Sequence, residues 1–209
     1  MVKDEIFGKL KRHPTAYIDD MAFLVGEIIV RENVIIAPGA SVRADECAPF
    51  YIGKGTNIQD GVILHGLLNQ FVQVKNKQYS IWIGSHCSIA HQVLIHGPCC
   101  IYKKCFIGPQ SQVWASHLGR NTFIGAQALI KNSKVGQRSY VGDRAAVKGV
   151  SIPNGRYVKD FQIVSTQKKA DNLPSIPNEF QKMADDFNHH VVDLNKELVQ
   201  LYKAGYRKK

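Results

Sequence analysis

The most regular feature of the chain is a six-residue period of hydrophobic positions. It is clearest from Ile83 to Leu118, where the sequence divides into IGSHCS, IAHQVL, IHGPCC, IYKKCF, IGPQSQ and VWASHL. Each unit opens with an aliphatic residue and usually has a small or apolar residue at its fifth place. This period fits neither an α-helix nor a flat sheet, and it is typical of a hexapeptide β-helix. In that fold each unit forms one short strand and one corner, and three units complete a triangular coil.

The same frame extends in both directions, with breaks at Glu46 to Phe50 and Leu67 to Ser80. The aliphatic openers are Val30, Ile36, Val42, Ile52, Ile58, Leu64, Ile83, Ile89, Ile95, Ile101, Ile107, Val113, Leu118, Ile124, Ile130, Val135, Val141 and Val147. Glycine often follows an opener, where a tight corner or a close contact between coils favours a residue without Cβ. We therefore predict an all-β domain, a left-handed parallel β-helix of hexapeptide repeats over residues 25–165, preceded by an N-terminal lead-in segment over 1–24.

A different pattern occupies residues 166–209. A polar linker with two prolines leads into apolar residues spaced three or four apart, which predicts an amphipathic helix from Glu179 to about Lys203. These apolar residues are Phe180, Met183, Phe187, Val191, Leu194, Leu198 and Leu201. We expect this helix to pack alongside a β-helix, either its own or a neighbour's.

Composition narrows the class of protein. The 209 residues, 44% of them hydrophobic, suffice for one core without a second domain. No secretory-type leader and no run of about 18 apolar residues is visible, which predicts a cytoplasmic protein without a membrane partner. The net charge of +10 raises the possibility of nucleic acid, but the basic residues are scattered and lack interleaved aromatic residues. We expect no nucleic-acid partner.

The five cysteines do not form a pattern typical of a disulfide framework. Cys87, Cys99 and Cys105 occupy the fifth place of their units and are expected to point into the core. Cys47 and Cys100 fall where a side chain should face outward.

Three histidines have the character of metal ligands. If residues 67–80 form an excursion that returns to the next coil, then Leu64 stacks on Ile95, and His65 and His96 project side by side from successive coils. Their imidazoles would suit one shared ion. His91 stands at the third place of the preceding unit and must point elsewhere, although in a cyclic trimer it could reach an ion held by a neighbour. Three neutral imidazoles leave an open fourth position, as in catalytic zinc sites.

Charged residues lie close to these histidines in the frame. Arg43 is the second residue of its unit, as His65 and His96 are, so it should stand in the same column of stacked residues. Asp60 is the third residue of its unit, which places it in the column of His91. An Asp beside an imidazole can orient its ring, whereas an Arg-Asp pair across a subunit boundary would fix the register of a trimer. A purely structural salt bridge accounts equally well for this pair. Glu46, on the first excursion, could accept a proton.

The sequence resembles the γ-class carbonic anhydrases, including the N-terminal domain of carboxysomal proteins of this class. The resemblance rests on segments 43–46, 57–65, 88–98 and 152–158 and on the C-terminal helix around Asn195. It implies a homotrimer in which His65 and His96 of one subunit and His91 of the next bind each metal ion. It further implies that Gln59 orients the metal-bound water, that Arg43 and Asp60 form an ion pair between subunits, and that Asn195 lines the pocket. Glu46 matches a carboxylate that the family uses near the metal.

The implied activity is the reversible hydration of CO2 to bicarbonate by a metal-bound hydroxide at the subunit interfaces. Zinc is the expected ion, and three histidines also suit Fe2+ or Co2+. One departure concerns proton export, because archetypal members have an acidic loop after the first histidine, whereas residues 67–80 contain no carboxylate. Two alternatives stay open: a catalytically silent metal-binding trimeric scaffold, and a hexapeptide-repeat acyltransferase, which needs a general-base histidine and a groove for an acyl-CoA donor.

Overall fold

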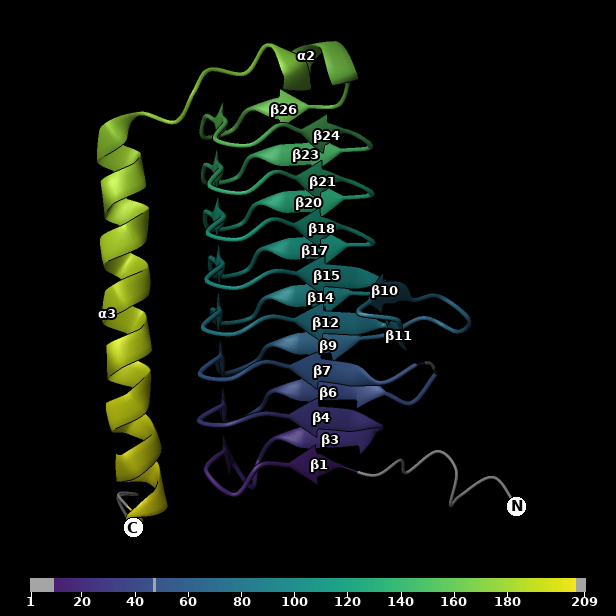
Figure 1. Ribbon diagram of the computed structural model, residues 1–209, viewed down its shortest axis with the longest axis vertical. Coiled ribbons are helices and arrows are strands. Elements are labelled where there is room, and N and C mark those ends of the chain that lie inside the picture. Colours follow the sequence, from purple (N-terminus) through teal and green to yellow (C-terminus); the bar gives the residue numbers. More distant parts are fainter. Residues whose placement is uncertain (1–9, 47, 206–209) are drawn as a thin grey trace.

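The computed structural model describes residues 10–46 and 48–205 and consists of a parallel β-helix with a long helix beside it (Figure 1). In these residues the strands form three eight-stranded sheets and one two-stranded sheet. Face A contains β1 (Lys11–Arg12), β4 (Ile28–Val30), β7 (Phe50–Ile52), β12 (Ile81–Ile83), β15 (Cys99–Ile101), β18 (His117–Leu118), β21 (Lys134–Val135) and β24 (Ser151–Ile152). Face B contains β2 (Tyr17–Ile18), β5 (Ile35–Ile36), β8 (Asn57–Ile58), β13 (Ser88–Ile89), β16 (Phe106–Ile107), β19 (Phe123–Ile124), β22 (Tyr140–Val141) and β25 (Tyr157–Val158). Face C contains β3 (Phe23–Gly26), β6 (Ser41–Ala44), β9 (Ile63–His65), β14 (Leu94–His96), β17 (Gln112–Trp114), β20 (Leu129–Lys131), β23 (Ala146–Lys148) and β26 (Ile163–Val164).

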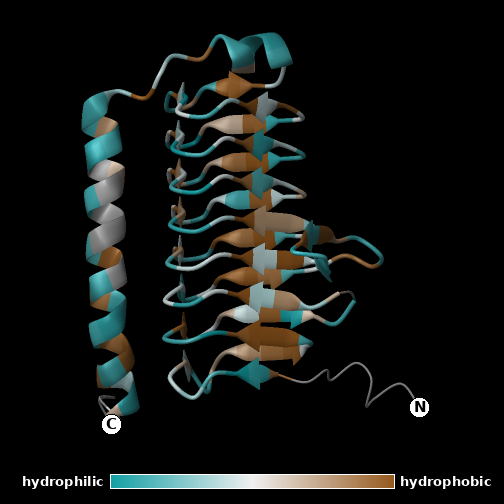
Figure 2. Ribbon diagram, viewed as in Figure 1, coloured by the Kyte–Doolittle hydropathy of each residue, from teal (hydrophilic) through white to brown (hydrophobic). Residues whose placement is uncertain are grey.

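The core is a set of aliphatic columns that run through the coils. The openers of the hexads are almost completely shielded from solvent, and Ile83, Ile89, Ile95, Ile101 and Ile107 have no exposed surface. Hydrophobic residues are concentrated in the strands and hydrophilic residues at many of the corners (Figure 2). Cys87, Cys99 and Cys105 belong to this core, as predicted. The six-residue period therefore places one aliphatic side chain inside each face of every coil.

Close stacking of the coils explains the glycine that follows many openers. A Cβ on Gly119 would lie 2.4 Å from the backbone nitrogen of Gln137 in the next coil, which is closer than real Cβ atoms approach. A larger residue there would force the coils apart.

The predicted register is confirmed. Parallel pairing aligns Ile52 with Ile83, Ile58 with Ile89 and Leu64 with Ile95. The excursion at residues 67–80 contains a short antiparallel hairpin of β10 (Val72–Val74) and β11 (Lys77–Tyr79), after which the chain rejoins face A. The insertion therefore leaves the stacking of successive coils intact.

The β-helix begins earlier than the sequence suggested. We placed residues 1–24 in a lead-in segment, but β1, β2 and β3 already form a coil beneath the next one. The register aligns Arg12 with the opener Val30, so a charged, exposed residue stands where the pattern requires an aliphatic one. Ile18 and Leu24 continue the six-residue period in this coil, and they align with the openers Ile36 and Val42.

Cys100 points away from the core, as predicted, but is only 2% exposed. It packs with Val72 and Tyr79 under the hairpin. Burial raises the pKa of its thiol to about 11, so the thiol stays protonated at neutral pH. Cys47 lies outside the described residues.

The C-terminal segment covers one end and one face of the β-helix. The short helix α2 (Gln167–Asp171), which the sequence did not reveal, contributes Ala170 to the core beside the last coil. The helix α3 (Asn178–Lys203) confirms the predicted amphipathic helix and runs back along the β-helix (Figure 1). Neither helix is long and apolar enough over its described residues to cross a lipid bilayer.

An aromatic ladder on face B holds the start of α3. Phe106, Phe123, Tyr140 and Tyr157 occupy successive coils, with ring centroids 4.7 Å apart for each of the first two pairs. Phe180 of α3 lies 5.1 Å from Tyr140 and 4.9 Å from Tyr157. This ladder gives the helix a fixed place on its own chain.

We therefore predict that Phe180→Ala loosens α3 without disturbing the coils. Loss of two aromatic contacts, each worth about 0.5–1.5 kcal/mol beyond burial, should raise amide hydrogen exchange in the first turns of α3 about tenfold. Exchange of the core strands should not change, and the exposed Lys182→Ala variant serves as the control. Unchanged exchange in α3 would show that the ladder does not anchor it.

Candidate metal centre

The end of face C brings His65 and His96 together. They close β9 and β14 and are aligned by the register, with Nδ1 of His65 3.3 Å from Nε2 of His96. Two nitrogens bound at about 2.0–2.1 Å to a tetrahedral zinc ion are also separated by about 3.3 Å. The pair therefore has the spacing of two ligands of one ion.

Trp114 fixes the position of His96. It follows in the same column one coil further on, and its ring stacks on that of His96 with centroids 4.3 Å apart and an angle of 14°. Trp114 was not among the residues predicted for the site, although its place in the column of the two histidines could have indicated it. Its bulk shields one side of the pair.

The protonation state of His96 suits a metal ligand. Burial, and then the neighbouring His65, lower the pKa of His96, so its ring is neutral at pH 7. Its Nδ1 atom is buried without a hydrogen-bond partner among the described residues. A neutral imidazole is the form that binds a metal ion.

Glu46 lies on the other side of His65. Its Oε1 atom is 3.2 Å from Nε2 of His65, and 42% of its side chain is exposed. A proton on Nε2 that is donated to this carboxylate leaves the Nδ1 lone pair directed toward His96. Glu46 is thus placed to orient the ligand and to exchange protons with solvent.

His91 lies elsewhere in the chain, in the turn between β13 and β14. Its Nδ1 atom is 2.6 Å from Oδ1 of Asp60, and 54% of its side chain is exposed. Asp60 therefore orients this imidazole, as one of the two sequence-based interpretations held. Over residues 10–46 and 48–205 no group of three or more His, Cys, Asp or Glu side chains could hold a metal ion. One chain thus places a pair of histidines at one edge of face C and a third histidine at the other.

The remaining candidate residues are placed separately. Arg43 is in the column of His65 as predicted, but within this chain it donates to Asp45 at 3.0 Å rather than to Asp60. Gln59 donates to Asn57 at 3.3 Å and to Ser88 at 3.4 Å. Neither side chain forms a hydrogen bond with His65 or His96 of its own chain.

Asn195 is 3% exposed and has two backbone partners. Its Nδ2 atom lies 3.4 Å from the carbonyl oxygens of Asn33 and Gly55, at the corner between faces A and B. In the single chain it ties α3 to the β-helix. Its predicted place in a pocket depends on the arrangement of neighbouring subunits.

Comparison with known proteins identifies the class and then the family. No family model matches the chain. Its fold is that of the hexapeptide-repeat proteins: a putative acetyltransferase from Bacillus cereus superimposes with a TM-score of 0.60 at 20% identity, over 93% of this chain and 94% of that one. At this identity the likeness concerns the fold alone.

Two curated relatives are much closer in sequence. Over 200 residues the chain is 37% identical to the carbonic anhydrase of Methanosarcina thermophila. The matched region covers 91% of this chain and 73% of the relative. Over 195 residues it is 40% identical to the carboxysome assembly protein CcmM of a Nostoc species. This match covers 93% of this chain and 31% of that protein. The chain thus spans about a third of the second relative. It belongs to the γ-class carbonic anhydrase family.

The site predicts a pH-dependent affinity for divalent cations. We expect zinc binding to be steady between about pH 7 and 8 and to be lost below about pH 6, because protons then compete for the imidazoles. Burial lowers the pKa of His96, so this ligand stays neutral to a lower pH than an exposed histidine. Competition with a chelator at each pH measures the affinity.

His96→Ala should weaken zinc binding by more than about a hundredfold, since loss of an outer-shell partner alone costs about 10–100-fold. The matched control is His117→Ala, because His117 is another partly buried histidine whose pKa is lowered by burial. Equal effects of the two substitutions would contradict the assignment of the site.

Proposed function

We propose that this protein catalyses the reversible hydration of CO2 to bicarbonate as a homotrimer, with a metal ion at each subunit interface. His65 and His96 of one subunit and His91 of the next would hold each ion. The observation that carries this proposal is the His65–His96 pair, whose nitrogens are spaced as two ligands of one ion. The cytoplasmic location expected from the sequence stays a prediction.

The surface of face C supports association through this face. Large apolar residues are exposed on face C and at its corner with face B. They are Met21 (74%), Phe23 (57%), Ile63 (44%), Phe161 (65%) and Ile163 (56%). Such surfaces are typical of subunit contacts. His91 precedes β14 and His96 ends it, so the two kinds of ligand flank the same face. A cyclic arrangement about face C would place the edge of one copy that carries His91 against the edge of the next copy that carries His65 and His96.

The donor set fits a catalytic divalent cation. Three neutral histidines suit Zn2+, and also Fe2+ or Co2+, and leave a coordination position open. When bound, such an ion supplies the positive charge that lowers the pKa of a water molecule to about 7. The carboxylate of Asp60 holds the His91 ring in one orientation, and Trp114 does the same for His96 by stacking. The side-chain amide of Gln59 and, from α3, that of Asn195 are proposed to orient water and a small uncharged substrate.

Proton release would depend on Glu46. The hairpin that follows His65 has no carboxylate, so it cannot carry protons in the manner of an acidic loop. Glu46 is partly exposed and contacts His65, which makes it the proposed acceptor. Arg43 and Asp60 are proposed to pair between subunits, in addition to their contacts within the chain.

The missing acidic loop also favours a second candidate, a metal-binding trimer that assembles with other proteins without turnover. One relative is a carboxysome assembly protein, although this chain corresponds to only 31% of its length. The acyltransferase alternative rests on the fold alone. Metal content and CO2 turnover separate all three functions.

Stopped-flow CO2 hydration on anaerobically purified, metal-analysed protein tests the proposal. We predict turnover that rises with buffer concentration, because an external buffer replaces the missing proton carrier. Glu46→Gln should lower the rate at low buffer about tenfold or more and recover at high buffer, whereas His91→Ala should abolish turnover. His117→Ala, outside the metal centre, is the control.

Absence of turnover in protein with a full complement of metal would contradict the enzymatic function and favour the assembly role. Full activity in His91→Ala would contradict the shared site.

A further inference from the structure

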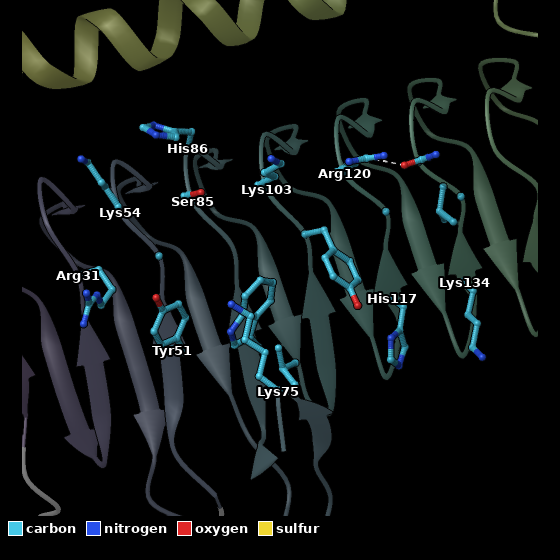
Figure 3. Close-up of a pocket in the computed structure, with 18 of the residues that line it drawn as sticks. Arg31, Tyr51, Lys54, Lys75, Ser85, His86, Lys103, His117, Arg120 and Lys134 are labelled. Atoms are coloured by element: carbon cyan, nitrogen blue, oxygen red, sulfur yellow. Dashed lines mark hydrogen bonds between the residues drawn. The ribbon is translucent and has the colours of Figure 1, made fainter. Parts of the chain in front are cut away.

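A large groove on face A is separate from the metal centre. It has a volume of about 1080 Å3 and extends across several coils (Figure 3), and Gln73, Val74 and Lys75 of the hairpin contribute to its lining. None of the three metal-site histidines lines it. The proposed subunit contacts involve face C, on a different side of the β-helix.

Glycines leave parts of the floor of this groove without side chains, on either side of Tyr102. Gly53, Gly119 and Gly136 follow their openers on face A and line the groove. A Cβ at any of them would lie 2.4–2.5 Å from backbone atoms of the next coil, so close stacking of the coils excludes side chains there. The requirement of the fold for glycine thus creates a trough parallel to the axis of the β-helix.

Positive charge surrounds the trough. Its lining has six lysines and arginines and one carboxylate, that of Glu32. The cations are Arg31, Lys54, Lys75, Lys103, Arg120 and Lys134. Glu32 pairs with Arg31 at 3.1 Å, and the four lysines form no salt bridge with any residue that the structure describes.

Three of these cations form a row at the corner between faces A and B. Lys54, Lys103 and Arg120 each stand two places after an opener, and Ser85 occupies the coil between the first two (Figure 3). At about 4.8 Å per coil, Lys54 and Arg120 are about 14 Å apart along the axis. The positive field also acts on nearby histidines: burial first, and then Lys54, lower the pKa of His86. Such a row favours an elongated anion.

Aromatic rings lie beside the cations. Tyr51 and Trp82 stack with centroids 5.8 Å apart and an angle of 8°, and Trp82 meets Tyr102 edge-on at 5.6 Å. The side chain of Tyr102 is 45% exposed within the groove. These rings offer a surface on which a planar group can stack.

From this arrangement we propose that the face A groove binds a nucleotide with two or three phosphates. The phosphates would contact Lys54, Lys103 and Arg120, and the base would stack on the aromatic rings. The rings occur only at the middle of the groove and the hairpin borders it, which favours one compact nucleotide over a long single strand. This site does not depend on the proposed carbonic anhydrase activity.

Titration of the whole chain with ATP, tripolyphosphate and adenosine tests the proposal. Calorimetry and tryptophan fluorescence at about 150 mM salt exclude long-range attraction, since the screening length there is about 8 Å. We expect ATP to bind more tightly than tripolyphosphate, adenosine to bind weakest, and the Trp82→Phe variant to lose most of the fluorescence change. Equal affinity for ATP and tripolyphosphate, or no binding at this salt concentration, would overturn the proposal.

Two double variants decide whether the groove is the site. Lys103→Gln with Arg120→Gln should weaken ATP binding about tenfold or more, because two charge-assisted contacts are lost. Lys168→Gln with Lys169→Gln removes the same charge from exposed positions of α2 and should leave binding unchanged. Circular dichroism confirms that each variant is folded. Equal weakening in both variants would show non-specific attraction, and tighter binding of a single-stranded oligonucleotide than of ATP would assign the groove to nucleic acid instead.

Discussion

The rest of this structure depends on the stacking of one coil directly on the next. Parallel strands on three faces fix the register, and an aliphatic residue of every strand of the three faces except β1 packs in or against the interior. The contact is so close that Gly119 cannot carry a Cβ. Because each coil repeats the positions of the previous one, any outward residue type that recurs at coil spacing becomes a column on the surface.

Both proposed functional surfaces arise from such columns. His65 and His96 meet because the hairpin at residues 67–80 is inserted without disturbing the register, and Trp114 continues their column. On face A, glycines at the ends of several strands leave room beside a row of cations. A rigid β-helix therefore holds these groups at fixed spacing, which is what a metal centre and an extended anion site both require.

The repeating part of the fold could be predicted from the sequence because each hexad indicates its inward residue locally. The stacking of Leu64 on Ile95, and with it the histidine pair, followed from counting units. The first coil was missed because Arg12 stands at the place of an opener and interrupts the run of aliphatic residues there. The short helix α2 was missed because five residues show no helical period.

Contacts that depend on side-chain conformation could not be predicted in this way. The pairing of Arg43 with Asp45, the anchoring of Asn195 on two backbone carbonyls and the burial of Cys100 under the hairpin each involve segments that leave the frame. The aromatic ladder on face B recurs every 17 residues, from Phe106 to Tyr157, and its spacing could have identified where α3 packs. The contacts between subunits could not be predicted in this way, because the six-residue period identifies only the residues that point into the core of one chain.

Mixed trimers test most directly the central claim, which is that each metal centre is shared between subunits. Neither His91→Ala nor His96→Ala chains alone can form a complete site. Unfolding and refolding them together should give mixed trimers in which one site combines an intact pair from one chain with His91 of the other, restoring about a quarter of all sites. We predict that zinc binding and CO2 hydration recover to about that fraction. No recovery from trimers that are shown to be mixed would contradict the shared centre.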